Sequence, residues 1–244
     1  MSFNLPTETI ELPSKGWLYP EGHPLSSGTI EIKYMTAKEE DILTNQNYIA
    51  NGTVLDKLLK SLIITKFNYD DLLIGDKNAV MVASRILGYG AEYKFTYNGK
   101  EEVADLSKLE NKPLDESLIT KGVNEFTFNL PASDNEITFQ FLTHGDETKI
   151  NQELEGLKKL GKEGSPELTT RLKYMVTSIN GDRTTKLIRE FVDEAFLARD
   201  ARAFREYISK IQPDVDLTFF PQSKSKSINL PIGISFFWPD VDLG

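Results

Sequence analysis

Alternation of hydrophobic and polar residues predicts antiparallel β-structure in the first half of the chain. Residues 30–34 carry apolar side chains at every second position, which is the pattern of a half-buried strand. Further along, Asn98 and Gly99 lie between two alternating stretches and can supply the positive φ angles of a tight hairpin turn. A second hairpin is predicted from the alternation in 126–130 and again in 137–141.

Short amphipathic helices are predicted between these strands. Thr36, followed three residues later by Glu39, is a capping box that opens a helix, and the Asn-Gly pair at 51–52 ends it. Apolar residues in 54–63 recur at helical spacing and predict a second helix. We expect Asp76 to cap a third helix, because an aspartate side chain accepts hydrogen bonds from the free amide groups at a helix start.

From residue 145 the apolar spacing becomes helical. Residues 150–157 carry one apolar stripe, and a second, opened by a Ser-Pro-Glu sequence, runs through 168–179. A third helix is predicted over 187–195. Asp200 is expected to cap a fourth, whose apolar residues lie in 204–211.

The two ends differ from these periodic stretches. Four prolines before residue 25 rule out a continuous helix and predict an extended arm, and the last part of the chain is β-like and aromatic. We therefore predict an α+β fold, with a mixed N-terminal half of short helices and antiparallel hairpins and a helical C-terminal half closed by an extended β-like tail. The predicted regions are an N-terminal arm (1–27), a mixed α+β region (28–143), a helical region (144–212) and an aromatic C-terminal tail (213–244).

Composition narrows the class of partner. The chain has 244 residues, 28 Lys and Arg against 37 Asp and Glu, and a formal net charge of −9. Nucleic-acid binders usually present a basic face, so nucleic acid is not expected as the main partner, and at most a small local basic patch remains. The absence of cysteine excludes disulfides and cysteine-ligated zinc. No apolar run is long enough to span a bilayer, and no secretion signal is seen. We therefore expect synthesis in the cytoplasm and no association with a membrane.

One segment has the spacing of a phosphate-binding loop. Residues 156–162 read GLKKLGK, but Glu163 stands where Ser or Thr would hold magnesium. The segment also continues a helix, whereas a phosphate-binding loop follows a strand. We interpret it as a basic helix end with a glycine stop.

A second segment gathers His144 with carboxylates in the sequence THGDE. Helix capping by Thr143 or Asp146 explains the same residues, and only one other histidine, His23, is present. No EF-hand spacing and no G-x-S-x-G motif occur. We therefore expect no metal, no cofactor and no catalytic residues, and a protein that is not an enzyme.

The aromatic residues near both ends are the candidate partner contacts. They lie beside proline and glycine in non-periodic sequence, and large aromatic residues are favoured anchors of interfaces. The candidates are Trp17, Leu18, Tyr19, Ile232, Ile234, Phe236, Phe237 and Trp238. Two interpretations remain open: the ends reach a neighbouring subunit, or they pack on the chain's own core. The first predicts that removing 230–244 weakens partner binding and leaves the isolated fold intact.

The chain resembles the T-even-type bacteriophage baseplate hub proteins. The resemblance rests on spaced segments that follow one another along nearly the whole chain: ELPSKGWLYPEGHPLSSGTIEIKYMTAKEEDILTNQ (11–46), VLDKLLKSLI (54–63), ILGYG (86–90), LTHGDE (142–147), LARDARAFREYI (197–208) and LPIGISFFWP (230–239). It implies a late viral protein that acts in hub formation beside hub, tape-measure or central-spike proteins, and that is found in the virion tail baseplate. Self-association of the chain is a further alternative.

Two roles are open within this family. The protein is either a permanent structural component of the hub, or a tail assembly chaperone that holds the tape-measure or hub proteins and then leaves. The strand and acidic helix in 28–41 are also similar to tail assembly chaperones. The aromatic ends favour the hub component. A third class, a cell-wall hydrolase, would need a pair of catalytic acids in a concave site, and we expect no such activity.

Overall fold

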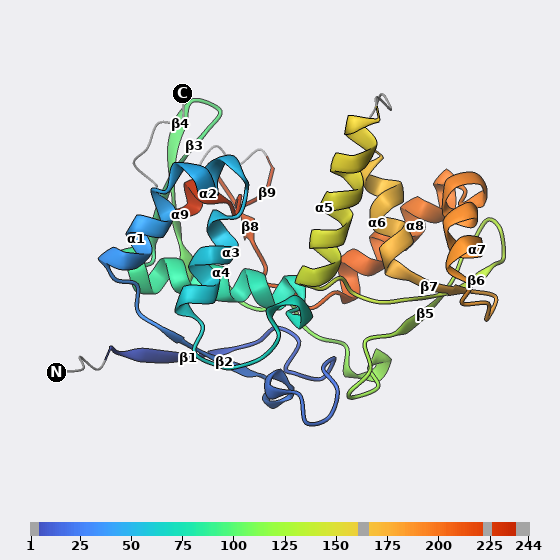
Figure 1. The fold of residues 1–244 in the computed structure, drawn as a ribbon, viewed down its shortest axis with the longest axis horizontal. Coiled ribbons are helices and arrows are strands. Elements are labelled where there is room, and N and C mark those ends of the chain that lie inside the picture. The colour runs from blue at the N-terminus through green and yellow to red at the C-terminus, as the bar shows by residue number, and fades with distance from the viewer. Residues whose placement is uncertain (1–4, 161–165, 222–225, 238–244) are drawn as a thin grey trace.

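The molecule has two lobes (Figure 1), and a cleft lined by residues of both lies between them. The computed structural model describes residues 5–160, 166–221 and 226–237. Residues 5–109, 217–221 and 226–237 build the first lobe, and residues 125–160 and 166–212 build the second. Helices and small antiparallel sheets occur in both, which confirms the α+β class.

The prediction that the N-terminal region projects as an extended arm is wrong. The described part of this region folds back on the first lobe, because its strand pairs with the next one along the chain. Strand β1 (Thr7–Glu11) pairs antiparallel with β2 (Thr29–Lys33), with Ile10 opposite Ile30. The loop between them passes Gly16 at φ 75°, where an added Cβ would lie 2.5 Å from the backbone nitrogen of Gly28. Only glycine fits such a close approach of two backbones.

Four helices follow in the first lobe. These are α1 (Ala37–Leu43), α2 (Gln46–Ala50), α3 (Val54–Leu62) and α4 (Ile74–Tyr89). The capping box of Thr36 and Glu39 is confirmed. The single helix predicted from there to residue 50 is wrong. The Asn45 side chain accepts hydrogen bonds from the backbone amides of Asn47 and Tyr48 and so starts a new helix.

The aspartates at 76 and 200 are not helix caps. Helix α4 has Leu73 at its N-cap, and α8 (Ala198–Ile211) has Leu197. Both aspartates lie in the first turn, are completely buried, and accept hydrogen bonds from distant loops. A capping side chain and one that binds a neighbouring loop occupy the same sequence position, so local pattern does not distinguish them.

The hairpin at Asn98 and Gly99 is confirmed. Strands β3 (Glu92–Tyr97) and β4 (Lys100–Asp105) pair antiparallel, and the turn residues have φ angles of 51° and 72°. Short 3₁₀ turns occur at Pro24–Ser27, Tyr69–Asp71, Leu106–Lys108 and Glu116–Leu118.

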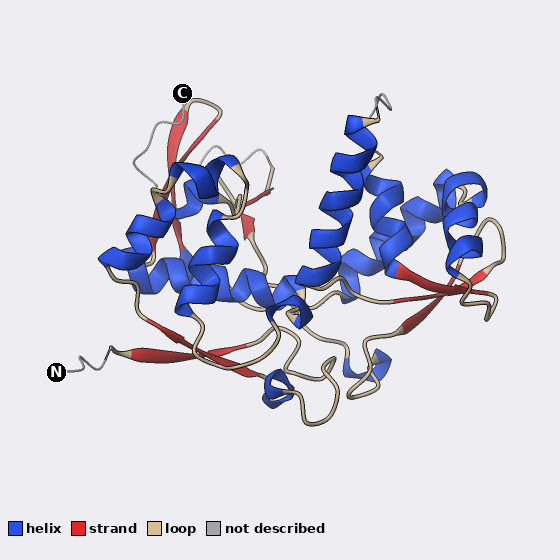
Figure 2. Ribbon diagram, viewed as in Figure 1, coloured by secondary structure: helices blue, strands red, loops and turns tan. Residues whose placement is uncertain are grey.

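The second lobe joins a three-stranded sheet to a group of helices, which lie on one side of it (Figure 2). The sheet order is β5 (Phe126–Asn129), β6 (Glu136–Phe139) and β7 (Val176–Ile179). The helices are α5 (His144–Lys159), α6 (Glu167–Met175), α7 (Thr185–Glu190), which continues as a π-helical turn (Phe191–Ala195), and α8.

The helix predicted through residue 179 is wrong in its last turn. Helix α6 ends at Met175, and the next four residues form β7, which pairs with β6. Two of those four residues are valine and isoleucine, which favour strands, and the open edge of β6 offers backbone partners. The predicted boundary at residue 143 therefore does not separate two structural units, because the sheet crosses it.

The tail returns to the first lobe and is not extended throughout. The segment around Asp214, which returns to the first lobe, pairs with the segment around Lys112, which leaves that lobe. Lys112 N donates to Asp214 O at 2.8 Å. Strands β8 (Thr218–Phe219) and β9 (Ile228–Asn229) pair, and then residues predicted as extended form the short helix α9 (Ile234–Phe237).

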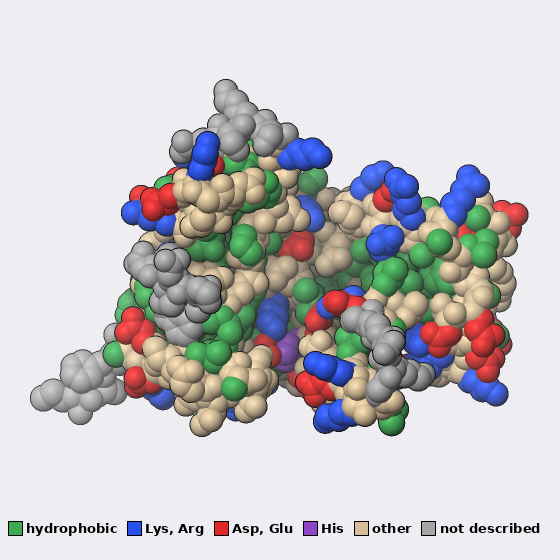
Figure 3. All heavy atoms as spheres, turned by 90° about the horizontal axis from the view of Figure 1, so that it is seen from above, with side chains coloured by type: hydrophobic (Ala, Val, Ile, Leu, Met, Phe, Trp, Pro, Cys, Tyr) green, Lys and Arg blue, Asp and Glu red, His purple; other side chains and the backbone are tan. Residues whose placement is uncertain are grey.

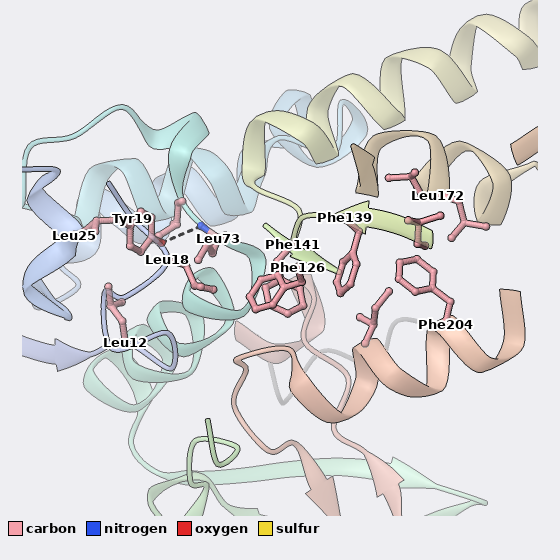
Figure 4. Close-up of a cluster of buried hydrophobic side chains, with 14 of the residues drawn as sticks. Leu12, Leu18, Tyr19, Leu25, Leu73, Phe126, Phe139, Phe141, Leu172 and Phe204 are labelled. Atoms are coloured by element: carbon pink, nitrogen blue, oxygen red, sulfur yellow. Dashed lines mark hydrogen bonds between the residues drawn. The ribbon is translucent and has the colours of Figure 1, made fainter. Parts of the chain in front are cut away.

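One hydrophobic core runs beneath the cleft through both lobes (Figure 4). It extends from Leu12 and Tyr19 past Leu73 to Phe139 and Phe204. A second cluster lies within the first lobe and contains residues from α3, α4 and β3 together with residues of the returning tail. The two lobes therefore share buried apolar area and fold as one cooperative body.

Candidate functional site

A cleft lies between the lobes, and polar side chains from both lobes line it. It has a volume of about 800 Å³, and Figure 3 shows it from above as a hollow with basic, acidic and histidine side chains at its floor. One wall is the end of α2 and the start of α3, and the other is α5.

Local sequence explains how each wall is positioned. The turn between α2 and α3 needs Gly52, which has φ 66°, and it presents Asn51 and Thr53 to the cleft. On the other wall, the capping box of Thr143 and Asp146 starts α5. The capping role expected for these two residues is therefore confirmed.

The walls combine amide and hydroxyl side chains with apolar ones. Asn151 and Gln152 project from α5, and Leu154 and Leu157 lie beside them at helical spacing. An amide side chain both donates and accepts hydrogen bonds, as a peptide backbone does. The cleft thus has the surface chemistry to hold a polypeptide segment by hydrogen bonds and apolar contact.

Four polar side chains meet at the floor of the cleft. Lys77 Nζ donates to Asp56 Oδ1 at 2.6 Å and lies 3.2 Å from His144 Nδ1. The Tyr69 hydroxyl donates to the same Asp56 oxygen at 3.3 Å, and its ring meets the His144 ring edge-on at 4.5 Å. The histidine belongs to the second lobe and the other three side chains to the first.

Burial and neighbouring charges determine the protonation state of His144 and Tyr69. Burial, followed by the nearby Lys77 ammonium, holds the pKa of His144 below its usual value. The imidazole is therefore neutral at pH 7, and its Nδ1 can accept a hydrogen bond from Lys77. Burial, together with the Asp56 carboxylate, raises the pKa of Tyr69, which stays protonated.

Backbone bonds next to the cluster join the lobes. His144 N donates to Leu72 O at 2.8 Å, and Ile74 N donates to Leu142 O at 3.1 Å. We call the four side chains of Asp56, Tyr69, Lys77 and His144 the joint. The two backbone hydrogen bonds lie beside it. Because its polar groups satisfy one another across the lobes, the joint has the character of a structural connection.

The structure explains the other two candidate motifs as well. Helix α5 continues through Gly156 to Lys159, as expected for a helix end, and residues 161–165 lie outside the described part. Within the described ranges, no group of three or more His, Asp or Glu side chains is close enough to hold a metal ion.

The N-terminal candidate contacts lie mostly in the chain's own core. Leu18 and Tyr19 are 3% and 4% exposed, and the Tyr19 hydroxyl donates to Asp76 Oδ2 at 2.7 Å. These two side chains therefore pack on the chain's own core, and their predicted contact with a partner stays a prediction. Trp17 is half-buried, and the ammonium of Lys121 lies 4.3 Å from the centre of its ring.

The C-terminal candidates give a similar result. Phe236 and Phe237 are fully buried in the first lobe, and Arg85 Nε donates to Phe236 O at 2.9 Å. Ile232 and Ile234 are half-buried and pack against the same cluster. Trp238 lies outside the described residues. Packing on the chain's own core, the second interpretation, describes these residues.

The cleft was not predicted from the sequence. Its two walls are about a hundred residues apart in the chain, and a polar helix face such as that of α5 reads as a solvated surface. The Asn-Gly pair at 51–52 was noted only as a helix stop. Nothing local indicates that it faces another lobe.

Comparisons of the chain with protein-family models, with curated proteins and with solved structures each returned no match. Across the described residues, no helix combines the length and apolar character needed to cross a bilayer.

Proposed function

We propose that this chain is a non-enzymatic structural component of a phage tail baseplate hub and acts in hub and tail assembly through protein–protein contacts. The observation that carries the proposal is the open cleft, whose lining combines amide, hydroxyl and leucine side chains with the charged Asp56, Glu155 and Lys158, and which suits a polypeptide segment. Its partners are other tail proteins, of the hub, tape-measure or central-spike kind, and its final location is the virion tail baseplate.

The segments that resemble the hub family support this proposal by their positions. Residues 11–46 form the β1–β2 hairpin, its loop and α1, and 54–63 form α3 with one wall of the cleft. The segment at 142–147 includes His144 of the joint, and residues 230–237 of the last segment anchor the tail. The segments on which the resemblance rests therefore lie at positions that build the two lobes and one wall of the cleft.

A second candidate, the tail assembly chaperone, is favoured by one observation. Leu18, Tyr19, Phe236 and Phe237 are buried in their own chain, so these four side chains are not free to lock a particle together. A self-contained body with an open cleft suits a protein that holds its partner for a limited time.

The experiment combines complementation with analysis of purified particles. Phage lacking the gene are complemented with Gln152→Trp, which fills the cleft, or with Lys159→Trp, which puts the same side chain on α5 away from the cleft lining. We expect the first variant to reduce infectious particles and the second to have little effect. Mass spectrometry of wild-type virions then decides the role, since the hub component is retained and the chaperone is absent. Equal titres of infectious particles for both variants would exclude the cleft as the site that binds a partner.

A further inference from the structure

A second concave surface lies in the second lobe, between α6 and α8 beside the start of α4. This groove has a volume of about 350 Å³, at the lower end of the range for ligand pockets. Its floor is apolar, with Leu172, Met175 and Ile208, and Leu168 at its edge is 42% exposed. It has room for a few apolar anchor side chains and not for a whole helix.

The carboxylates around the groove already have partners. Glu147 pairs with Arg171, and Asp214 Oδ1 accepts from Asn78 Nδ2 at 3.0 Å and from the Val215 amide at 2.8 Å. Arg171 therefore offsets the charge of Glu147, whereas the neutral donors on Asp214 do not offset its charge. The groove lining still carries three basic side chains, Lys112, Arg171 and Arg205, against these two acids.

The basic residues at the rim are different. Four arginines of this lobe are ion-paired: Arg171 with Glu147, Arg183 with Glu125, Arg189 with Glu153 and Arg202 with Glu206. Within the described ranges, Arg205 and Lys112 at the groove form no ion pair. Arg205 makes a single hydrogen bond, from Nε to Ala201 O at 3.3 Å. Its two terminal nitrogens make no hydrogen bond within the described residues, and a guanidinium can bind a carboxylate in bidentate fashion.

Helix α8 extends this basic rim along its exposed face. Arg199, Arg202, Arg205 and Lys210 are exposed there, with Glu206 as the one exposed acid. The chain as a whole has a net charge of −9, so this positively charged face differs in sign from the molecule's overall charge. A partner that binds here must carry acidic groups next to its apolar ones, because unpaired cations favour carboxylates at close range.

We propose that the groove between α6 and α8 binds an acidic amphipathic helix of a partner protein. Its apolar side chains enter the groove over Leu172 and Met175, and its carboxylates pair with Arg205 and Lys112. An amphipathic helix is the occupant because it can place an apolar stripe over the floor of the groove and acidic side chains beside Arg205 and Lys112 at the same time. The inference deepens the proposed function, on which it rests, by giving the chemistry of one partner contact.

The test measures binding of a fluorescent stapled peptide of about 18 residues, with leucines on one face and glutamates on the other. We expect the folded protein to bind it, and Arg205→Glu to weaken binding about tenfold or more, since truncation or reversal of a charge at an interface has effects of that size. Binding should also weaken from about 0.05 M to about 0.3 M salt.

Matched controls separate the groove from general charge. Lys186→Glu reverses a charge on α7 of the same lobe, at an exposed position outside the groove lining and outside the basic face of α8, and should alter affinity less than about twofold. Ser209→Trp fills the groove without changing charge and should abolish binding, with circular dichroism confirming that each variant is folded.

Three outcomes would overturn the proposal. The first is absence of binding, and the second is equal binding of a peptide with lysine in place of glutamate. The third is self-association of the protein that Arg205→Glu removes, which would assign the groove to a second copy. None of these depends on virion content or on the cleft variants, so the inference can fail while the proposed function stands.

Discussion

Asp76 is the residue on which the N-terminal loop depends. Its carboxylate accepts three hydrogen bonds: from the Ser14 amide at 2.9 Å, from the Ser14 hydroxyl at 2.7 Å and from the Tyr19 hydroxyl at 2.7 Å. Burial raises the pKa of Asp76, although these hydrogen bonds oppose the effect. The Tyr19 oxygen in turn accepts from the Leu73 amide, so one acid holds a loop against the start of α4.

We expect Asp76→Ala to destabilise the protein by about 3 kcal/mol, because it leaves buried donors of Ser14 and Tyr19 without an acceptor. Urea unfolding followed by circular dichroism measures this. Asp41→Ala, an exposed aspartate on α1, is the matched control and should change stability by less than about 0.5 kcal/mol. Equal effects would mean that the loop does not depend on Asp76.

Glu39 should make stability depend on pH in the acid range. Burial alone would raise its pKa, but hydrogen bonds from Lys33, Thr36 and Ser61 outweigh it and lower the pKa from 4.5 to about 2. A lowered pKa means that the stabilisation is fully present above pH 4.5 and is lost as pH falls towards 2. The amount is on the order of 3 kcal/mol.

Glu39→Gln tests this expectation by unfolding at a series of pH values. The variant should be less stable than wild type at neutral pH, and the difference should shrink as pH falls below 4.5. Glu40→Gln, the exposed neighbour, serves as the control and should keep the wild-type dependence. A pH-independent difference would contradict the role assigned to the Glu39 charge.

At the level of elements, the sequence predicted what is decided locally. The two capping boxes and the Asn98-Gly99 turn occur as expected, because each depends on residues within four positions of one another. Strand β7 and helix α9 were not predicted. The first depends on the edge of β6, and the second on a site in the first lobe that accepts two phenylalanine rings.

Helix α9 should stabilise the first lobe strongly for its length. Phe236 and Phe237 are fully buried, and Phe236 meets the Tyr93 ring at 4.9 Å. We expect Phe236→Ala to cost about 3–5 kcal/mol, the range for buried aromatic residues. Phe220→Ala, which changes a residue 75% exposed in the same tail, is the control and should be near neutral in thermal unfolding. Similar melting temperatures for both variants would contradict the anchoring role.

At the scale of the whole molecule, the lobes are held by a shared core and by the joint. None of this was readable in the sequence, since Asp56, Lys77 and His144 come from three separate helices. Each residue has an ordinary local explanation as a helix-surface charge or a first-turn histidine. Only the close approach of α3, α4 and α5 makes them a cluster.

The joint should weaken in mild acid. The lowered pKa of His144 means that the folded state favours the neutral imidazole, so stability is full above about pH 6.5 and falls as pH drops below it. Protonation places a second cation beside Lys77. The measurement is a spin-label distance across the cleft with Asn51→Cys and Gln152→Cys, which label cleanly because the chain has no cysteine.

The distance should broaden or lengthen between about pH 7.5 and about pH 5. His144→Gln should remove this response, while His23→Gln, a change in the other histidine of the chain, should leave it intact. A response that survives His144→Gln would place the sensitive group elsewhere.

The return of the tail has a consequence for biosynthesis. The core of the first lobe is closed by Leu230, Phe236 and Phe237, which the ribosome adds after the residues of the second lobe, although most of the first lobe is made before them. A nascent chain therefore keeps α3, α4 and β3 partly uncovered until residues 230–237 have emerged. A chain that stops before residue 230 leaves this core open, so we expect such a product to expose apolar surface and to aggregate more readily than one that includes Phe237.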